Sequence, residues 1–195
     1  MDAGVDPSPG AALGIDAAAA ALRRGAVLAY PTESVWGLGC DPRNEAAVRA
    51  LLAAKQRDPA QGLILIAATV AQLDAHIDWF TLDEAQANAV RASWPGPNTW
   101  LMPCPPETPR WLRGTHETLA VRVTAHPVAA ALCDAFGGAI VSTSANRSGA
   151  PAPRARADLD DALLAQIDGI VDGETGGAAQ PSTIRDARTG AILRG

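Results

Sequence analysis

Four short apolar runs limit the fold of this chain more than any other feature of its sequence. They cover residues 26–30, 62–67, 118–123 and 139–143. Runs of this length that are rich in aliphatic residues and bounded by turn residues are typical of buried strands. Segments with helix signals lie between them, and this alternation predicts an α/β domain.

The segments between the runs carry residues that start and stop helices. Asp16 is expected to cap a helix that ends at Gly25, and Asn44 a second helix with one apolar face. Pro127 is expected to open a helix that runs to about Phe136. Further predictions are helices over 69–77, 82–94 and 158–167, a strand over 99–102, and a closing hairpin over 182–195.

The chain is expected to form one domain. Several connections between predicted strands are too short for a helical crossover, which favours a mixed sheet. No repeat, linker or change of composition divides the sequence. Residues 1–14 begin with an acidic stretch that contains Pro and Gly and does not resemble a secretory signal. We expect them to be a flexible tail, with the domain over 15–195.

Charge and composition restrict the class of ligand. The net charge is −5, which argues against a protein that holds a nucleic acid tightly through its phosphates. No apolar run is long enough for a membrane span. Cys40, Cys104 and Cys133 are scattered and suggest neither a disulfide framework nor a zinc site. A cytoplasmic protein with a small-molecule ligand, no membrane contact and no tight nucleic-acid binding is expected.

Lys55 is the only lysine beside fifteen arginines. It continues the inward face of the second predicted helix, which should end near Gln56 because Asp58 precedes Pro59. Lys55 and Arg57 then converge at one mouth, where two cations suit a polyphosphate or a carboxylate. The alternative is that both are helix C-terminal charges that complement the helix dipole.

Polar side chains follow the strand over 139–143, among them Ser142, Ser144 and Asn146. Ligands usually lie beyond the carboxyl ends of strands in open α/β sheets. Hydroxyl and amide groups there can bind phosphate or ribose without adding charge. The same residues suit a capped turn that satisfies the local backbone. The residues themselves favour neither interpretation.

Further candidates lie elsewhere on the predicted strands and turns. Thr32 and Glu33 follow the first strand, and Arg122 lies inside an apolar one. A buried arginine needs an anionic ligand or a structural Asp or Glu. Ser182 and Arg194 should be close if the terminal hairpin forms. The histidines lack metal-ligand spacing, and nothing favours a Ser-His-Asp hydrolase, although such a triad assembles in space.

Six segments in this order resemble the YrdC-like family, most closely its short, single-domain bacterial TsaC type. The resemblance extends from about residue 15 to the C-terminus. It implies a twisted, open, mixed α/β sheet with flanking helices and a large polar cavity. The segments are PTESVWGLGCDP (31–42), KQRDPAQGLILIA (55–67), WPGPNTW (94–100), TLAVRVTAHP (118–127), STSANRSG (142–149) and STIRDARTGAILR (182–194).

The resemblance also implies an activity, the synthesis of threonylcarbamoyl-AMP. L-threonine, bicarbonate and ATP with Mg²⁺ would give L-threonylcarbamoyladenylate and pyrophosphate. Downstream tRNA threonylcarbamoyl-transferase proteins would use the adenylate to modify an adenosine beside the anticodon. The nucleotide would lie at the sheet edge beside STSANRSG.

The resemblance assigns site residues but no protein metal site and no acid–base residue. Lys55 and Arg57 would stabilise charge in the transition state. The residues implied for ATP are Lys55, Arg57, Thr118, Ser144, Asn146 and Arg194, and those for threonine are Thr32, Arg122, Ser142 and Ser182.

Two positions depart from many longer relatives. Ala67 stands where they carry a histidine, and Ala152-Pro153-Arg154 replaces Ser-Pro-Thr. The sequence also ends before their extra domain, so a more open active site is expected. Two other functions remain open, an RNA-binding module without catalysis and a carbamoyl-adenylate enzyme with a different amine substrate.

Overall fold

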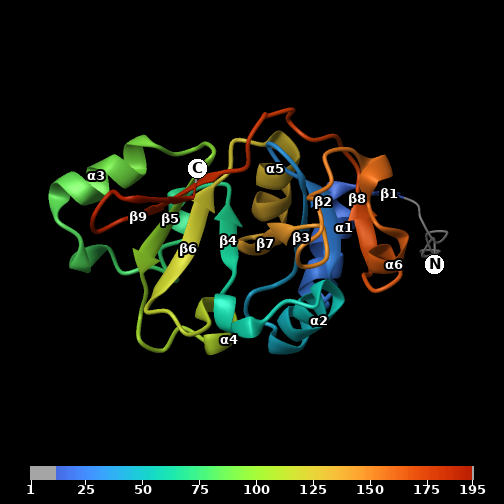
Figure 1. The fold of residues 1–195 in the computed structure, drawn as a ribbon, viewed down its shortest axis with the longest axis horizontal. Helices are drawn as coiled ribbons and strands as arrows, with labels where there is room; N and C mark the ends of the chain where they lie inside the picture. The colour runs from blue at the N-terminus through green and yellow to red at the C-terminus, as the bar shows by residue number, and fades with distance from the viewer. Residues whose placement is uncertain (1–11, 195) are drawn as a thin grey trace, which may run out of the picture.

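The computed structural model describes residues 12–194. Its ten strands form one mixed sheet (Figure 1). The order is β1-β8-β2-β3-β7-β4-β6-β5-β9-β10, with both parallel and antiparallel neighbours. The predicted open, mixed α/β sheet is confirmed. The strands are β1 (Ala12–Leu13), β2 (Leu28–Pro31), β3 (Trp36–Gly39), β4 (Ile64–Ala67), β5 (Asn98–Pro103), β6 (Thr118–Val123), β7 (Ile140–Ser144), β8 (Gly169–Val171), β9 (Thr183–Asp186) and β10 (Ile192–Arg194).

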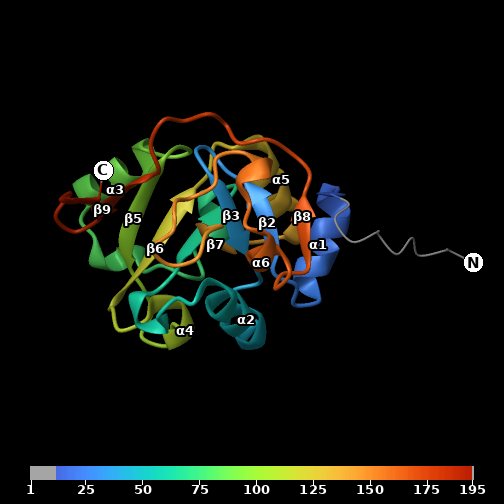
Figure 2. The same ribbon diagram turned by 45° about the vertical axis from the view of Figure 1, so that its right-hand side comes forward.

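Six α-helices flank the described part of the sheet (Figures 1 and 2). Helices α1 and α5 pack together. None of the helices within residues 12–194 could cross a membrane. The helices are α1 (Ile15–Arg23), α2 (Glu45–Lys55), α3 (Glu84–Ala92), α4 (Arg110–Arg113), α5 (Pro127–Phe136) and α6 (Asp161–Leu164).

Alternation along the strands produces two apolar cores. Tyr30, Ile66 and Ile140 lie in one core with the buried residues of α1 and α5. Their neighbours Ala29 and Leu65 lie in the other core, together with residues of α2 and α3. Because successive side chains of a strand point to opposite faces, helices on both faces of the sheet are required.

The N-terminal part of the prediction needs two corrections. Residues 1–11 of the expected tail lie outside the described residues, but Ala12 and Leu13 form β1, which pairs with β8. The tail therefore cannot extend to residue 14. The N-cap of α1 is Gly14 rather than Asp16. Asp16 lies in the first turn, where its negative charge interacts favourably with the positive end of the helix dipole.

The predicted helix over 82–94 begins later because Asp83 caps it, accepting a hydrogen bond from the Gln86 amide. The segment over 69–77 forms only a 3₁₀ turn at Val70–Gln72, and 158–167 retains one helical turn. In the last segment, Asp160 accepts from the Leu163 amide and sets a late start. The Asp83 and Asp160 side chains thus set the late starts of α3 and α6.

Besides β1, the sequence prediction missed two strands, β3 and β8. β3 and β8 contain glycine, which has low strand propensity, and their pairing with other strands supplies the stabilisation. β7 lies between β3 and β4. STSANRSG therefore begins in a strand that has a neighbour on each side.

Gly39 permits close packing of β3, and its replacement by alanine is expected to destabilise the fold by about 1–3 kcal/mol. An added Cβ would lie against the Val141 carbonyl oxygen and 2.7 Å from Cε1 of Tyr30. Urea unfolding measures the loss. Gly138→Ala is the control, since no atom lies within 4 Å of its added Cβ. Equal stability of the two variants would contradict this packing argument.

Candidate functional site

A cavity of about 350 Å³ opens on one face of the sheet. Its floor includes one row of residues from four adjacent strands, in which Ser142 pairs with Ile64, Ile64 with Ala120, and Ala120 with Leu101. These partners share a face because directly opposed residues of neighbouring strands point the same way. The β2–β3 turn and the β9–β10 hairpin form the walls.

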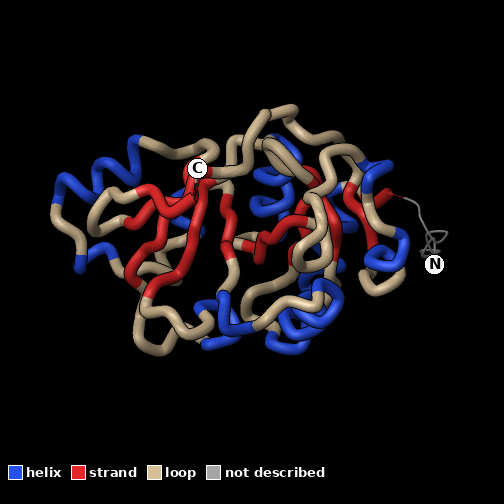
Figure 3. The backbone as a smooth tube through the Cα atoms, viewed as in Figure 1, coloured by secondary structure: helices blue, strands red, loops and turns tan. Residues whose placement is uncertain are grey.

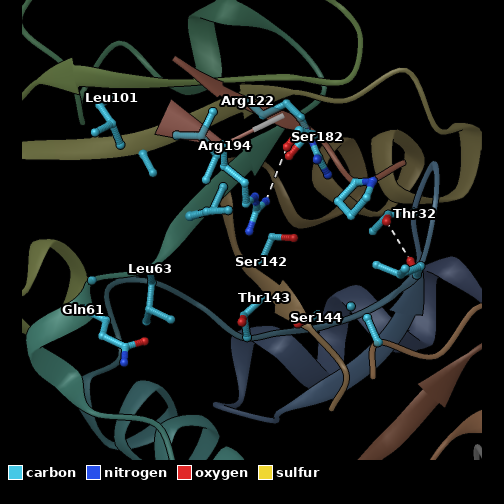
Figure 4. A pocket seen from close by; sticks show the side chains of 18 of the residues that line it. Thr32, Gln61, Leu63, Leu101, Arg122, Ser142, Thr143, Ser144, Ser182 and Arg194 are labelled. Carbon is cyan, nitrogen blue, oxygen red and sulfur yellow. Dashed lines mark hydrogen bonds between the residues drawn. The ribbon is translucent and has the colours of Figure 1, made fainter. Parts of the chain in front are cut away.

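The two ends of the cavity differ in chemistry (Figure 4). Leu63 and Leu101 lie toward one end, called the apolar end although Gln61 lies beside Leu63. Thr32 and Ser182 lie at the other end with Arg122. Arg194 and Ser142 lie between the two ends. A ligand that fits this arrangement has a flat or apolar part, a central anionic part and a small polar part.

Arg122 and Glu33 form an ion pair at the polar end. The Arg122 Nη2 lies 3.3 Å from Oε2 of Glu33, and both side chains are largely buried. Thr124 Oγ1 and the Ala125 amide donate to Oε1 at 2.8 and 3.1 Å. Burial alone would raise the pKa of Glu33, but Arg122 and these hydrogen bonds lower it below the ordinary value. The sequence left two partners open for Arg122, an anionic ligand or a structural Asp or Glu. The structure shows the second, which is Glu33.

That carboxylate does not satisfy the whole guanidinium. The Nε of Arg122 is buried and has no hydrogen-bond partner among the described residues. Arg122 also lines the cavity. The side chain can therefore be held by Glu33 and still donate to an anion in the cavity.

Besides Arg122, three arginines that bring positive charge line the cavity, namely Arg57, Arg113 and Arg194. Arg57 Nη2 donates to the Gly62 carbonyl at 3.0 Å, and Arg194 Nη2 to the Ser182 carbonyl at 3.4 Å. Burial and the charge of Arg194 lower the pKa of Arg57. Among the described lining residues, Glu33 is the only carboxylate, and it already pairs with Arg122. This excess of positive charge favours an anionic ligand.

Lys55 lies behind the cavity wall and does not line it. Its side chain is buried, and Nζ donates to the carbonyl oxygens of Ser144 and, at 2.5 Å, Asn146. Burial, and secondarily the charge of Arg57, lowers its pKa from 10.5 to about 8. Lys55 therefore fixes the backbone that follows β7 and places a positive charge beside it.

Asn146 also lies outside the cavity lining. Its Nδ2 donates to the carbonyl oxygens of Arg147, at 3.0 Å, and Ala150. Ser142 and Ser144, by contrast, line the cavity. Both interpretations of this stretch thus hold in part, since it is a capped turn at Asn146 and a cavity wall at the serines.

The sequence analysis found most of the polar lining and missed the apolar end. Apolar side chains such as Leu63 and Leu112 carry no signal that separates a cavity from a core. Glu33 was noted but not paired with Arg122, because the pairing depends on the fold. Eight of the ten predicted residues line the cavity, namely Thr32, Arg57, Thr118, Arg122, Ser142, Ser144, Ser182 and Arg194.

The described residues offer neither a cluster of metal ligands nor an activated thiol at Cys40 or Cys133. Within residues 12–194, no three His, Cys, Asp or Glu side chains gather as metal ligands would. Cys40 and Cys133 are buried, and burial raises the pKa of each thiol to about 12. Neither thiol is thus activated as a nucleophile. Ala67 is buried in β4 and lies outside the cavity lining.

Comparisons with solved structures agree with this fold. P. abyssi Sua5 complexed with L-threonine superposes with a TM-score of 0.81 and 33% identity, over 88% of this chain and 50% of that one. This chain spans about half the length of that protein. E. coli YciO gives a TM-score of 0.78 and 26% identity, over 92% of this chain and 87% of that one.

Sequence relatives extend over nearly the whole chain. The threonylcarbamoyl-AMP synthase of Xanthomonas campestris pv. campestris (strain B100) is 58% identical, covering 92% of this chain and 96% of the relative. That of Stenotrophomonas maltophilia (strain K279a) is 54% identical, covering 93% and 98%. A family model named Sua5/YciO/YrdC, described as telomere recombination, matches residues 20–195. The chain belongs to the Sua5/YciO/YrdC family.

Proposed function

We propose that this protein is a threonylcarbamoyl-AMP synthase. It joins L-threonine, bicarbonate and ATP into L-threonylcarbamoyladenylate and pyrophosphate. The observation that carries the proposal is one cavity with an apolar end, a central excess of positive charge and a polar end at Arg122. The chain shares 54–58% identity with relatives that bear this name.

Threonine occupies the polar end in this proposal. The Arg122 guanidinium binds its carboxylate, because arginine presents a planar pair of donors to such a group. Ser142, Ser182 and Thr32 surround the rest of the amino acid. Thr99 Oγ1 donates to Ser182 Oγ at 2.9 Å, and Thr32 Oγ1 donates to the Val35 carbonyl at 2.7 Å. These hydroxyls are therefore held in fixed positions before the substrate arrives.

ATP occupies the rest of the cavity, with its base at the apolar end and its phosphates between Arg57 and Arg194. Thr118 and Ser144 supply hydroxyl groups to the nucleotide. Lys55 and Asn146 act from behind the wall, through the backbone of residues 144–146 and through the charge of Lys55. Mg²⁺ enters with ATP and is held mainly by phosphate oxygens and water, as is usual for this ion.

Two bond-forming steps follow from this placement. The threonine ammonium first loses a proton. The neutral amine then attacks the carbon of bicarbonate, and loss of water gives a carbamate. A carbamate oxygen then attacks the α-phosphorus of ATP, and pyrophosphate leaves. Charge grows on the phosphoryl oxygens and the leaving group, where Arg57, Arg194 and Lys55 stabilise it. Positioning by fixed groups supplies the remaining acceleration.

The product then leaves for another protein. A cytoplasmic tRNA threonylcarbamoyl-transferase accepts the adenylate in this proposal. Direct binding of tRNA by this chain is at most weak, because the net charge of −5 opposes it.

Pyrophosphate release from ATP tests the proposal. We expect release that requires L-threonine and bicarbonate together and is much slower with L-serine, which lacks the β-methyl group. Detection of the adenylate by mass spectrometry completes the measurement. Binding of ATP without threonine-dependent release would overturn the proposal, in favour of a different amine substrate or a carrier role.

A further inference from the structure

The segment between β8 and β9, residues 172–181, arches over the sheet and is called the strap (Figures 2 and 3). It contains no helix or strand, and none of its residues is buried. Its last two residues, Gln180 and Pro181, line the cavity beside Ser182. A segment without buried side chains depends on hydrogen bonds for its position.

Backbone hydrogen bonds attach the strap to the polar end of the cavity. The amide of Gly176 donates to the Thr32 carbonyl at 3.0 Å, and the amide of Ala178 to the Glu33 carbonyl at 2.9 Å. Both acceptors belong to residues that line the cavity. The position of the strap is thereby coupled to the end that we assign to threonine.

His126 Nε2 lies 2.9 Å from the carbonyl oxygen of Glu174 in the strap, and Arg154 adds a further attachment. Its Nη1 and Nη2 donate to the carbonyl oxygens of Ala178 and Ala179 at 3.2 and 2.6 Å, and its own carbonyl accepts from Thr175 Oγ1 at 2.7 Å. The guanidinium thus spans two consecutive peptide groups, and the strap binds back to the same residue.

Hydrogen bonds also hold the backbone at Pro153 and Arg154 in place. The preceding carbonyl, that of Pro153, accepts from the Trp36 amide in β3 at 2.8 Å. The Arg154 amide donates to Oδ2 of Asp158 at 3.2 Å. Arg154 therefore connects the strap to a stretch that is held by β3 and by Asp158.

We propose that Arg154 is a positioning residue that holds the strap closed over the threonine end, and that the strap opens to admit and release substrate. This inference rests on the proposed function for its choice of substrate. The side chain of Arg154 is exposed, so its hydrogen bonds contribute only modestly to stability. A modest attachment suits a segment that must open during each turnover.

Three variants test the assignment. Arg154→Ala removes both donor groups. Arg154→Lys keeps the positive charge, but its single ammonium group cannot replace the guanidinium that binds two carbonyl oxygens. Arg24→Ala, an exposed arginine at the C-cap of α1, is the matched control. Hydrogen–deuterium exchange of the Gly176 and Ala178 amides should be faster in Arg154→Ala, intermediate in Arg154→Lys and unchanged in Arg24→Ala.

Kinetics provide the second readout. Arg154→Ala should raise the KM for threonine about fivefold, the scale of one weak hydrogen-bonded attachment. The KM for ATP and kcat should change less than about twofold, because the strap attaches at the threonine end. Equal loss for both substrates, or an effect on kcat alone, would contradict a positioning role at that end.

The exchange experiment separates this inference from the proposed function. Unchanged exchange at Gly176 and Ala178 in Arg154→Ala would overturn the role of Arg154, whatever the activity. If the unmodified protein shows no threonine-dependent pyrophosphate release, the proposed function fails. Exchange would then still decide whether Arg154 holds the strap.

Discussion

Replacement of Arg122 by methionine is expected to raise the KM for threonine about a hundredfold and to destabilise the fold by about 3–5 kcal/mol. The first effect follows from loss of the group that binds the substrate carboxylate. The second follows because Glu33, 3.3 Å from Arg122 and largely buried, is left without its positive partner. Steady-state kinetics and urea unfolding measure the two effects.

A double variant separates substrate binding from stability. Arg122→Met combined with Glu33→Gln removes both charges, so that neither remains buried and unpaired. The glutamine oxygen can still accept from Thr124 Oγ1 and the Ala125 amide. The double variant should regain much of the stability and none of the threonine affinity. A near-normal KM for threonine in either variant would refute the assignment of Arg122 to the carboxylate.

Replacement of Lys55 by methionine is expected to slow threonine-dependent pyrophosphate release roughly 10²- to 10³-fold, the scale of losing one transition-state stabilising group. Methionine fills a similar volume but cannot donate to the carbonyl oxygens of Ser144 and Asn146. The cation beside the phosphates is lost as well. Arg49→Met on the exposed face of the same helix is the control and should leave the rate unchanged.

The charge of Lys55 can be followed directly. As the only lysine, it gives one side-chain Cε signal after ¹³C-lysine labelling. Burial lowers its pKa to about 8, so the charged form and the activity should both decline as pH rises through about 8. The stability of the fold should instead rise between pH about 8 and 10.5. In that range the unfolded chain keeps the Lys55 proton and the folded chain has lost it. A rate in Lys55→Met equal to that of the unmodified protein would exclude the role of Lys55.

The sequence by itself determined the elements whose signals are local. The apolar run over 118–123 matches β6, and Pro127 and Phe136 are the ends of α5. Asn44 caps α2 by accepting from the Ala47 amide. In each case neighbouring residues provide both the signal and the hydrogen bonds, so nothing distant along the chain is needed. Most of the polar cavity lining was likewise indicated, because polar residues beside a buried strand stand out.

Only the tertiary structure decided which distant groups meet. Glu33 in the β2–β3 turn pairs with Arg122 in β6, far away in the sequence. Lys55 reaches the carbonyl oxygens of Ser144, at the end of β7, and Asn146. The apolar end of the cavity was invisible for the same reason, since a leucine beside a ligand and a leucine in a core follow one pattern. Local propensity fixes the elements, but long-range pairing sets the register of the sheet and hence the site.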